Sequence, residues 1–127
     1  MRIISLFSGA GGLDLGLVKA GNEVVWANDI DVSAVETYRR NIGDHIVCKD
    51  IKDVSMDEIP DNADVVVGGF PCQGFSQANL LRDVGDARNA LYLFFRKVVA
   101  AKTPRYFIAE NVKGILSLGK GEVIRRI

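Results

Sequence analysis

The chain has 127 residues, of which 48% are hydrophobic and 25% charged, and its 16 basic side chains balance 16 acidic ones. This composition excludes a disordered or low-complexity chain and indicates one compact domain with a modest core. No apolar run approaches the roughly 20 residues of a membrane span, and no signal peptide is recognisable, so we expect a cytoplasmic protein with no membrane contact. Two cysteines and one histidine are too few for a zinc cluster or a disulfide framework, so no metal site is expected.

The charges are unevenly distributed along the chain. Residues 1–71 carry 6 basic and 12 acidic side chains, a net charge of −6, whereas residues 72–127 carry 10 basic and 4 acidic, a net charge of +6. Zero overall charge argues against nucleic-acid binding by bulk electrostatics. The basic half could still face phosphate groups, although segregated charge also arises by chance on solvated surfaces.

In the first half of the chain, the predicted strands and helices alternate. Gly21 is expected to end the first helix, and Asp31 is expected to cap the second. The expected elements are, in chain order, a strand at 2–7, a helix at 13–20, a strand at 23–28, a helix at 32–41 and a brief strand that ends at Val47.

The second half continues the same alternation. Its expected elements are a connection that includes 56–60, a strand at 63–69, a helix at 88–101, a strand at 105–110 and a helix that begins at 113. The β-branched run at 63–69 is typical of a parallel strand covered on both faces. The strand at 105–110 is expected beside the first strand. This alternation predicts an α/β fold with a doubly wound, mostly parallel sheet.

A glycine-rich turn, Ser8-Gly9-Ala10-Gly11-Gly12, lies where the first strand should pass into a helix, so its backbone N–H groups can approach a nucleotide. Asp29, at the end of the second strand, can accept hydrogen bonds from ribose hydroxyls, and Asp50 from an adenine amino group. Asp14 replaces the last glycine of the dinucleotide fingerprint, which disfavours a nicotinamide cofactor. S-adenosylmethionine fits better because it has ribose and adenine but no pyrophosphate. Alternatively, the glycines form only a tight turn and the aspartates are ordinary strand-end carboxylates.

A cysteine follows the most apolar strand, in the sequence GGFPCQGFS at 68–76. Cys72 should therefore emerge at the carboxyl edge of the sheet, where open α/β folds bind ligands, whereas Cys48 is expected to be a small buried hydrophobe. Glu110, at the end of the next strand, could point into the same cleft. A thiol and a nearby carboxyl suit conjugate addition to a pyrimidine, in which sulfur attacks C6 and the acid at N3 stabilises the developing charge. A structural pairing of Glu110 with an arginine such as Arg88 is the alternative.

The sequence resembles the catalytic region of the cytosine-C5 DNA methyltransferases. Blocks similar to that family follow in its order between residues 6 and 112: Leu6-Phe7-Ser8-Gly9-Ala10-Gly11-Gly12, Asp29-Ile30, Asp50-Ile51, Pro71-Cys72-Gln73-Gly74-Phe75-Ser76 and Glu110-Asn111-Val112. The segment 86–91 also resembles the family's segment that closes the nucleophile loop. Ser5 stands where many members have aspartate. The resemblance implies the S-adenosylmethionine-dependent, Rossmann-like methyltransferase fold.

The resemblance also implies a reaction and the residues that carry it. Cys72 would add to C6 of a cytosine flipped out of double-stranded DNA, Glu110 would engage N3, and C5 would receive the methyl group of S-adenosylmethionine. The DNA contacts would come from Gln73, Ser76 and Arg88. The implied cofactor residues are Phe7, Gly9, Gly11, Gly12, Asp29, Ile30, Asp50, Ile51, Pro71 and Leu91. The commonest setting for compact members is a bacterial restriction system, in which the protein works at the nucleoid.

Residues 1–127 resemble only the N-terminal part of the family's catalytic domain. The target-recognition region and the C-terminal closing segment have no counterpart here, so we expect the chain alone neither to recognise a DNA sequence nor to turn over. It would be a truncated enzyme or half of a split one, with a second chain supplying target recognition. A tRNA cytosine-C5 methyltransferase and a non-catalytic methyltransferase-like subunit remain alternatives; Gln73-Gly74-Phe75-Ser76 favours a DNA enzyme over a tRNA enzyme, and the presence of Cys72 with Glu110 argues against a non-catalytic chain.

Overall fold

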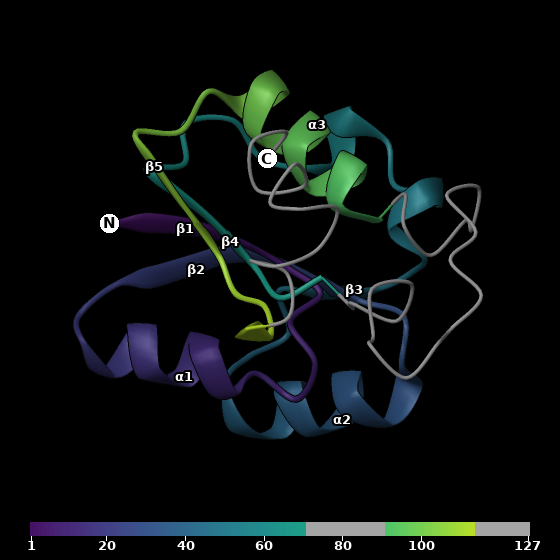
Figure 1. Cartoon of the computed structure of the whole chain (residues 1–127). Helices are drawn as coiled ribbons and strands as arrows, with labels where there is room; N and C mark the ends of the chain where they lie inside the picture. Colours follow the sequence, from purple (N-terminus) through teal and green to yellow (C-terminus); the bar gives the residue numbers. More distant parts are fainter. Residues whose placement is uncertain (71–90, 114–127) are drawn as a thin grey trace.

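The computed structural model describes residues 1–70 and 91–113 and confirms the predicted α/β fold (Figure 1). Five parallel strands form one sheet in the order β3-β2-β1-β4-β5. The strands are β1 (Arg2–Leu6), β2 (Glu23–Asp29), β3 (Ile46–Cys48), β4 (Val65–Gly68) and β5 (Tyr106–Ala109). The helices are α1 (Gly12–Lys19), α2 (Val32–Asn41) and α3 (Leu91–Lys102), with 3-10 turns η1 (Ile51–Asp53) and η2 (Met56–Glu58) in the connection before β4. All but the first residue of the helix expected from residue 113 onward, and the first three residues of the helix expected at 88–101, lie outside the described residues.

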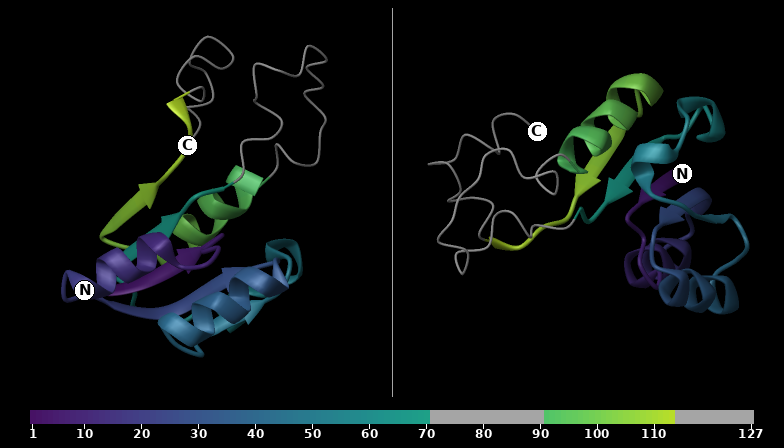
Figure 2. Two further views of the ribbon diagram at one scale, coloured as in Figure 1. Left: turned by 90° about the horizontal axis from the view of Figure 1, so that it is seen from below. Right: turned by 90° about the vertical axis from the view of Figure 1, so that its right-hand side faces the viewer.

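Helices cover both faces of the sheet, as a doubly wound fold requires. Helices α1 and α2 lie against one face, and α3 with the 3-10 turns lies against the other (Figures 1 and 2). Side chains alternate along β4 and therefore contribute to the cores on both faces of the sheet. Val65 and Val67 belong to the cluster under α2, whereas Val66 belongs to the cluster that contains Phe95 of α3. All four residues of β4 are buried. The prediction that this strand is covered on both faces is therefore confirmed.

The position of β5 corrects one expectation. The strand at 105–110 was expected beside the first strand, but β5 pairs with β4, and β4 lies between β5 and β1. Because β4 is apolar on both faces, it gains most from a central position, whereas β5 carries exposed side chains and takes the edge of the described sheet.

Cys48 corrects a second expectation. Its side chain is exposed rather than buried. It ends β3, a three-residue strand at the other edge of the described sheet, and its thiol lies 3.8 Å from the carbonyl oxygen of Ile30. A short edge strand has few neighbouring residues that could bury its last side chain. The small, weakly polar side chain of Cys48 is therefore not enough to place it in the core.

The predicted helix ends agree with the structure. The Asp31 carboxylate accepts a hydrogen bond of 2.9 Å from the Ala34 amide and so caps α2. Gly21 follows α1 with a φ of +84°, and its amide donates to the Val18 carbonyl oxygen at 2.9 Å. No helix in the described part of the chain has the length and apolar character to cross a membrane.

Candidate functional site

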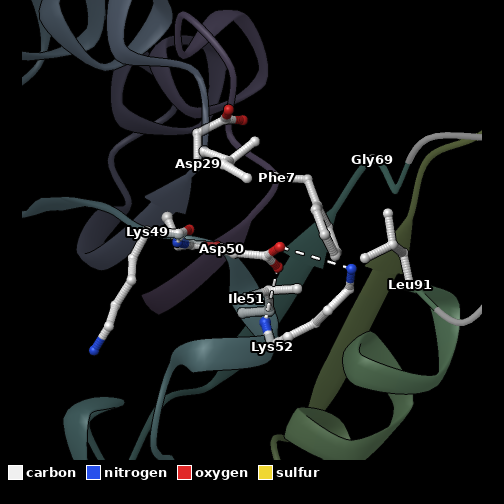
Figure 3. A pocket seen from close by; sticks show the side chains of 10 residues that line it. Phe7, Asp29, Lys49, Asp50, Ile51, Lys52, Gly69 and Leu91 are labelled. Carbon is white, nitrogen blue, oxygen red and sulfur yellow. Dashed lines mark hydrogen bonds and ion pairs between the residues drawn. The ribbon is translucent and has the colours of Figure 1, made fainter. Parts of the chain in front are cut away.

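The carboxyl ends of the parallel strands surround a pocket of about 310 Å³ (Figure 3). This edge is where open α/β sheets bind ligands, because the chain turns away from the sheet there. The predicted cofactor residues that line the pocket are Phe7, Asp29, Ile30, Asp50, Ile51 and Leu91. They come from four segments that are far apart in the sequence. The fold therefore brings into one pocket side chains that belong to separate sequence motifs.

Asp29 connects the end of β2 to the glycine-rich turn. One carboxylate oxygen accepts a hydrogen bond of 2.7 Å from the Gly9 amide, and the other accepts one of 2.9 Å from the Asp31 amide. Each carboxylate oxygen can accept a further hydrogen bond, so the group stays available to a ligand hydroxyl. The two backbone donors fix the carboxylate at the pocket wall before any ligand arrives.

The glycine-rich turn depends on backbone conformations that most residues avoid. Phe7, Gly9 and Gly11 have φ of +55°, +55° and +88°, all in the left-handed region. The Ser8 amide donates to the Asn28 carbonyl oxygen at 2.9 Å, and the Gly11 amide donates to the Ser8 carbonyl oxygen at 3.0 Å. Gly12 then begins α1. Phe7 is a bulky residue held with positive φ at a pocket wall, and such strain is concentrated at functional sites.

Asp50 and Ile51 form the opposite side of the pocket. Asp50 caps η1 by accepting from the Lys52 amide at 3.0 Å, and its other oxygen lies 3.7 Å from the Lys52 ammonium (Figure 3). Ile51 is buried and belongs to the core on the α3 side. Lys49 also borders the pocket, but its ammonium pairs with Glu58 at 2.9 Å.

Asn28 was not singled out from the sequence, although it positions this side of the pocket. Its side chain is 1% exposed and donates to the carbonyl oxygens of Val47 at 3.3 Å and Lys49 at 2.7 Å. These bonds tie the end of β2 to the segment that presents Asp50. The signal available in the sequence is a polar residue inside an otherwise apolar strand, immediately before Asp29.

Glu110 lines a second pocket, of about 230 Å³, that shares Phe7 and Gly69 with the first. Its amide donates to the Gly68 carbonyl oxygen at 3.0 Å, which continues the β4–β5 pairing to the end of the sheet. A Cβ on Gly69 would lie 2.9 Å from a carboxylate oxygen of Glu110, so the absent side chain at Gly69 makes room for that carboxylate. Glu110 therefore lies next to the candidate cofactor pocket. The prediction that it shares a cleft with Cys72 involves a residue outside the described ones.

Asn111 belongs to the Glu110-Asn111-Val112 motif, from which no role for it could be predicted, and the structure supplies one. Its side-chain amide donates to the Phe70 carbonyl oxygen at 2.9 Å. Phe70 precedes Pro71 and Cys72, so this bond fixes the chain where it enters the cysteine loop. The predicted site residues Pro71, Cys72, Gln73, Ser76 and Arg88 themselves lie outside the described residues.

A buried carboxylate beside the second pocket was not predicted as a site residue either. Asp14 of α1 is 1% exposed and accepts hydrogen bonds from Ser5 at 2.7 Å and Tyr38 at 2.8 Å. Burial raises the pKa of Asp14 above its usual value, although both hydrogen bonds oppose the shift. Burial and the adjacent carboxylate likewise raise the pKa of Tyr38. Within the described residues, no three His, Cys, Asp or Glu side chains group as a metal ion would require.

The family model for C-5 cytosine-specific DNA methylases matches residues 1–127, the whole chain. The chain belongs to this family. The chain is 48% identical to the Type II methyltransferase M.NgoFVII of Neisseria gonorrhoeae over 99% of its own length and 34% of that protein. It is 42% identical to the Type II methyltransferase M.FnuDI of Fusobacterium nucleatum, covering all of this chain and 37% of that protein.

A solved structure shows the same fold. The Dnmt2 methyltransferase of S. pombe superposes on the chain with a TM-score of 0.77 and 27% sequence identity, over 99% of this chain and 40% of that one. The chain thus spans a little over a third of the length of its relatives. The comparisons confirm the predicted family and the methyltransferase fold.

Proposed function

We propose that this chain is the N-terminal part of the catalytic domain of a DNA (cytosine-5)-methyltransferase that uses S-adenosylmethionine. The observation that carries the proposal is that the two pockets are neighbours, because Phe7 and Gly69 line both the pocket of the predicted cofactor residues and the pocket of Glu110. A cofactor and a base held in adjacent pockets could react directly. The family match and the relatives named as Type II methyltransferases support the same reaction.

The residues of the first pocket fit S-adenosylmethionine. The Asp29 carboxylate is fixed by two amides at the end of β2 and would accept ribose hydroxyls, and Asp50 would accept the adenine amino group. Phe7, Ile51 and Leu91 would provide apolar surface for the adenine ring. The volume of 310 Å³ lies within the range of about 300–1,000 Å³ typical of ligand sites. When bound, S-adenosylmethionine supplies the methyl group that is transferred.

The base chemistry would rest on Cys72 and Glu110. The Cys72 thiolate would add to C6 of the flipped cytosine, and Glu110 at N3 would stabilise the negative charge that develops on the ring. This addition makes C5 nucleophilic toward a methyl group. Loss of the C5 proton afterwards would let the sulfur leave. Glu110 borders the second pocket, which is consistent with a base lying there.

We infer that the substrate would be double-stranded DNA, contacted by Gln73, Ser76 and Arg88. The enzyme would act at the bacterial nucleoid as part of a restriction system. The target-recognition region would lie in a part of the enzyme that these 127 residues do not span or in a second chain, since the chain covers 34% and 37% of two relatives. The isolated chain would then bind the cofactor without methylating a defined DNA sequence.

Replacing Asp29 with alanine tests the cofactor proposal. We expect calorimetry to show S-adenosylmethionine binding by the wild-type chain and a dissociation constant about 10 to 100 times higher for Asp29→Ala, because hydrogen bonds to a charged group contribute about 1.5–3 kcal/mol. Asp57→Ala removes the same charge from exposed η2 and should leave the dissociation constant unchanged. Equal affinities for Asp29→Ala and wild type would count against the ribose role, and no binding by the wild type against the cofactor itself.

Adding a methyl group at Gly69 tests the placement of Glu110. In Gly69→Ala the new Cβ would approach a carboxylate oxygen of Glu110, the end of a flexible side chain, so the carboxylate should move while the fold remains stable. We expect the rate of methyl transfer, measured with the target-recognition region present, to fall about tenfold or more. Small displacements of groups near the reacting atoms lower the rate by large factors. Gly16→Ala, whose new Cβ would have no atom within 4 Å, is the matched control. Wild-type transfer rates in Gly69→Ala would refute this placement.

A further inference from the structure

A chain of buried polar groups connects α2 to the glycine-rich turn. Asp14 lies at its centre and accepts from Tyr38 on one side and from Ser5 on the other. Ser8, inside the turn, donates to the Ser5 hydroxyl at 3.0 Å, and His45 Nε2 lies 3.1 Å from the Tyr38 hydroxyl. Asp14, Ser5 and Tyr38 are each at most 1% exposed. The proposed methyl-transfer chemistry uses none of these side chains.

The hydrogen bonds of this network have one consistent direction. Tyr38 has a single hydroxyl proton and donates it to Asp14, so the tyrosine oxygen accepts and His45 must carry a proton on Nε2. On the other side, the Ser8 hydroxyl lies within donating distance of both the Ser5 hydroxyl, at 3.0 Å, and the Ser5 carbonyl oxygen, at 3.2 Å, and the Ser5 hydroxyl donates to Asp14. Both arms therefore end on one carboxylate, which accepts from each. Loss of either hydroxyl leaves a buried carboxylate oxygen without its donor, which is unfavourable.

The network acts on the turn in two independent ways. Through Ser8 it holds the residue whose carbonyl oxygen accepts the Gly11 amide at 3.0 Å. Through the Tyr38 ring it sets the space around Gly11, since a Cβ there would lie 2.7 Å from that ring. Ser5, Ser8 and Asp14 also border the pocket that Glu110 lines. The same side chains thus support the turn and line the pocket that also contains Glu110.

A purely structural role accounts poorly for the polarity of these positions. Asp14 projects from the first turn of α1 onto the sheet, where an apolar side chain would pack without the cost of removing a carboxylate from water. Unlike an apolar residue, a hydrogen-bonded carboxylate fixes the orientation of its donors. Asp14 thereby orients the Ser5 hydroxyl and, through it, Ser8.

We propose that Asp14 and Tyr38 are positioning residues for the cofactor, which hold the Ser8–Gly11 turn in its binding conformation through the hydroxyls of Ser5 and Ser8. This inference rests on the proposed function for the identity of the ligand, but the ordering of the turn does not depend on it.

The test combines two measurements on the 127-residue chain. Tyr38→Phe keeps the ring against Gly11 and removes only the hydroxyl. Ser5→Ala removes the hydroxyl that links Ser8 to Asp14 and leaves Ser8 only the backbone carbonyl oxygen of residue 5 as an acceptor. We expect each to raise the dissociation constant for S-adenosylmethionine about five- to tenfold. We also expect faster native-state amide hydrogen exchange at Gly9 and Gly11 in both variants. Since both changes act on one network, the double variant should lose less affinity than the product of the single effects.

Val35→Ala is the matched control. Val35 lies on α2 in the same buried cluster as Tyr38, and its side chain is apolar. This variant should lower the melting temperature at least as much as Tyr38→Phe while leaving the dissociation constant within about twofold of wild type. Affinity losses that merely follow melting temperature across all variants would overturn the inference, as would unchanged exchange at Gly9 and Gly11 in Tyr38→Phe. Faster exchange with no cofactor binding by the wild type would refute the proposed function and leave the positioning role supported.

Discussion

Replacing Cys72 with serine is expected to abolish covalent capture of DNA that contains 5-fluorocytosine. Fluorine at C5 cannot leave as a proton, so an enzyme that adds through sulfur to C6 becomes trapped after methyl transfer. A serine hydroxyl is far less ionised than a thiol near neutral pH and does not replace the thiolate as a nucleophile. The measurement is a denaturing gel of the chain mixed with fluorinated DNA, S-adenosylmethionine and a partner chain that supplies the target-recognition region.

The other cysteine provides the control for this experiment. Cys48 is exposed at the end of β3, so Cys48→Ser tests whether any accessible thiol reacts with the DNA. We expect adduct formation by Cys48→Ser at the wild-type level. An adduct that persists in Cys72→Ser would refute the assignment of the nucleophile. No adduct with the wild-type chain and its partner would contradict the reaction itself.

Local sequence features predicted the elements and two residues of the pocket wall, Asp29 and Asp50, whereas the family resemblance added Phe7, Ile30, Ile51 and Leu91. The apolar run of β4 indicated a buried parallel strand, and a glycine turn followed by aspartates at strand ends indicated where a nucleotide would bind. Asp29 and Asp50 could be found because each stands at the end of its own strand, and all parallel strands end at one edge. The topology then brought both into one pocket.

Features that depend on distant pairing could not be predicted in the same way. Whether β5 lies beside β1 or β4 depends on which strand is stabilised most by burial in the centre of the sheet. The short, exposed sequence of β5 does not indicate which of the two is its neighbour. The buried set around Asp14 joins residues 24 positions apart, so its members look like ordinary surface residues in the sequence. The prediction for Cys48 was wrong because it rested on residue type alone. The exposure of Cys48 is decided instead by its position at the end of an edge strand.

Gly11→Ala should cause a larger loss of stability than alanine at Gly9 or Gly16. Gly11 has a φ of +88°, where a side chain costs about 1–2 kcal/mol. Its added Cβ would also overlap the end of Ile42 and lie 2.7 Å from the Tyr38 ring, in a well-packed region where overpacking costs about 1–3 kcal/mol. We therefore expect the free energy of unfolding to fall by about 2–5 kcal/mol, a large part of the total for a small domain.

The two other alanine substitutions separate the causes of that loss, with urea unfolding as the measurement for all three. Gly9 has a φ of +55°, but a Cβ added there would have no atom within 4 Å, so Gly9→Ala should show the backbone cost of about 1–2 kcal/mol alone. Gly16 lies inside α1 with neither feature, and Gly16→Ala should stabilise the chain by about 0.5–1 kcal/mol. If Gly11→Ala were no worse than Gly9→Ala, close packing of Tyr38 and Ile42 against the turn would be refuted. Because the Tyr38 ring is the same side chain whose hydroxyl reaches Asp14, that result would also remove one of the two contacts by which α2 fixes the cofactor turn.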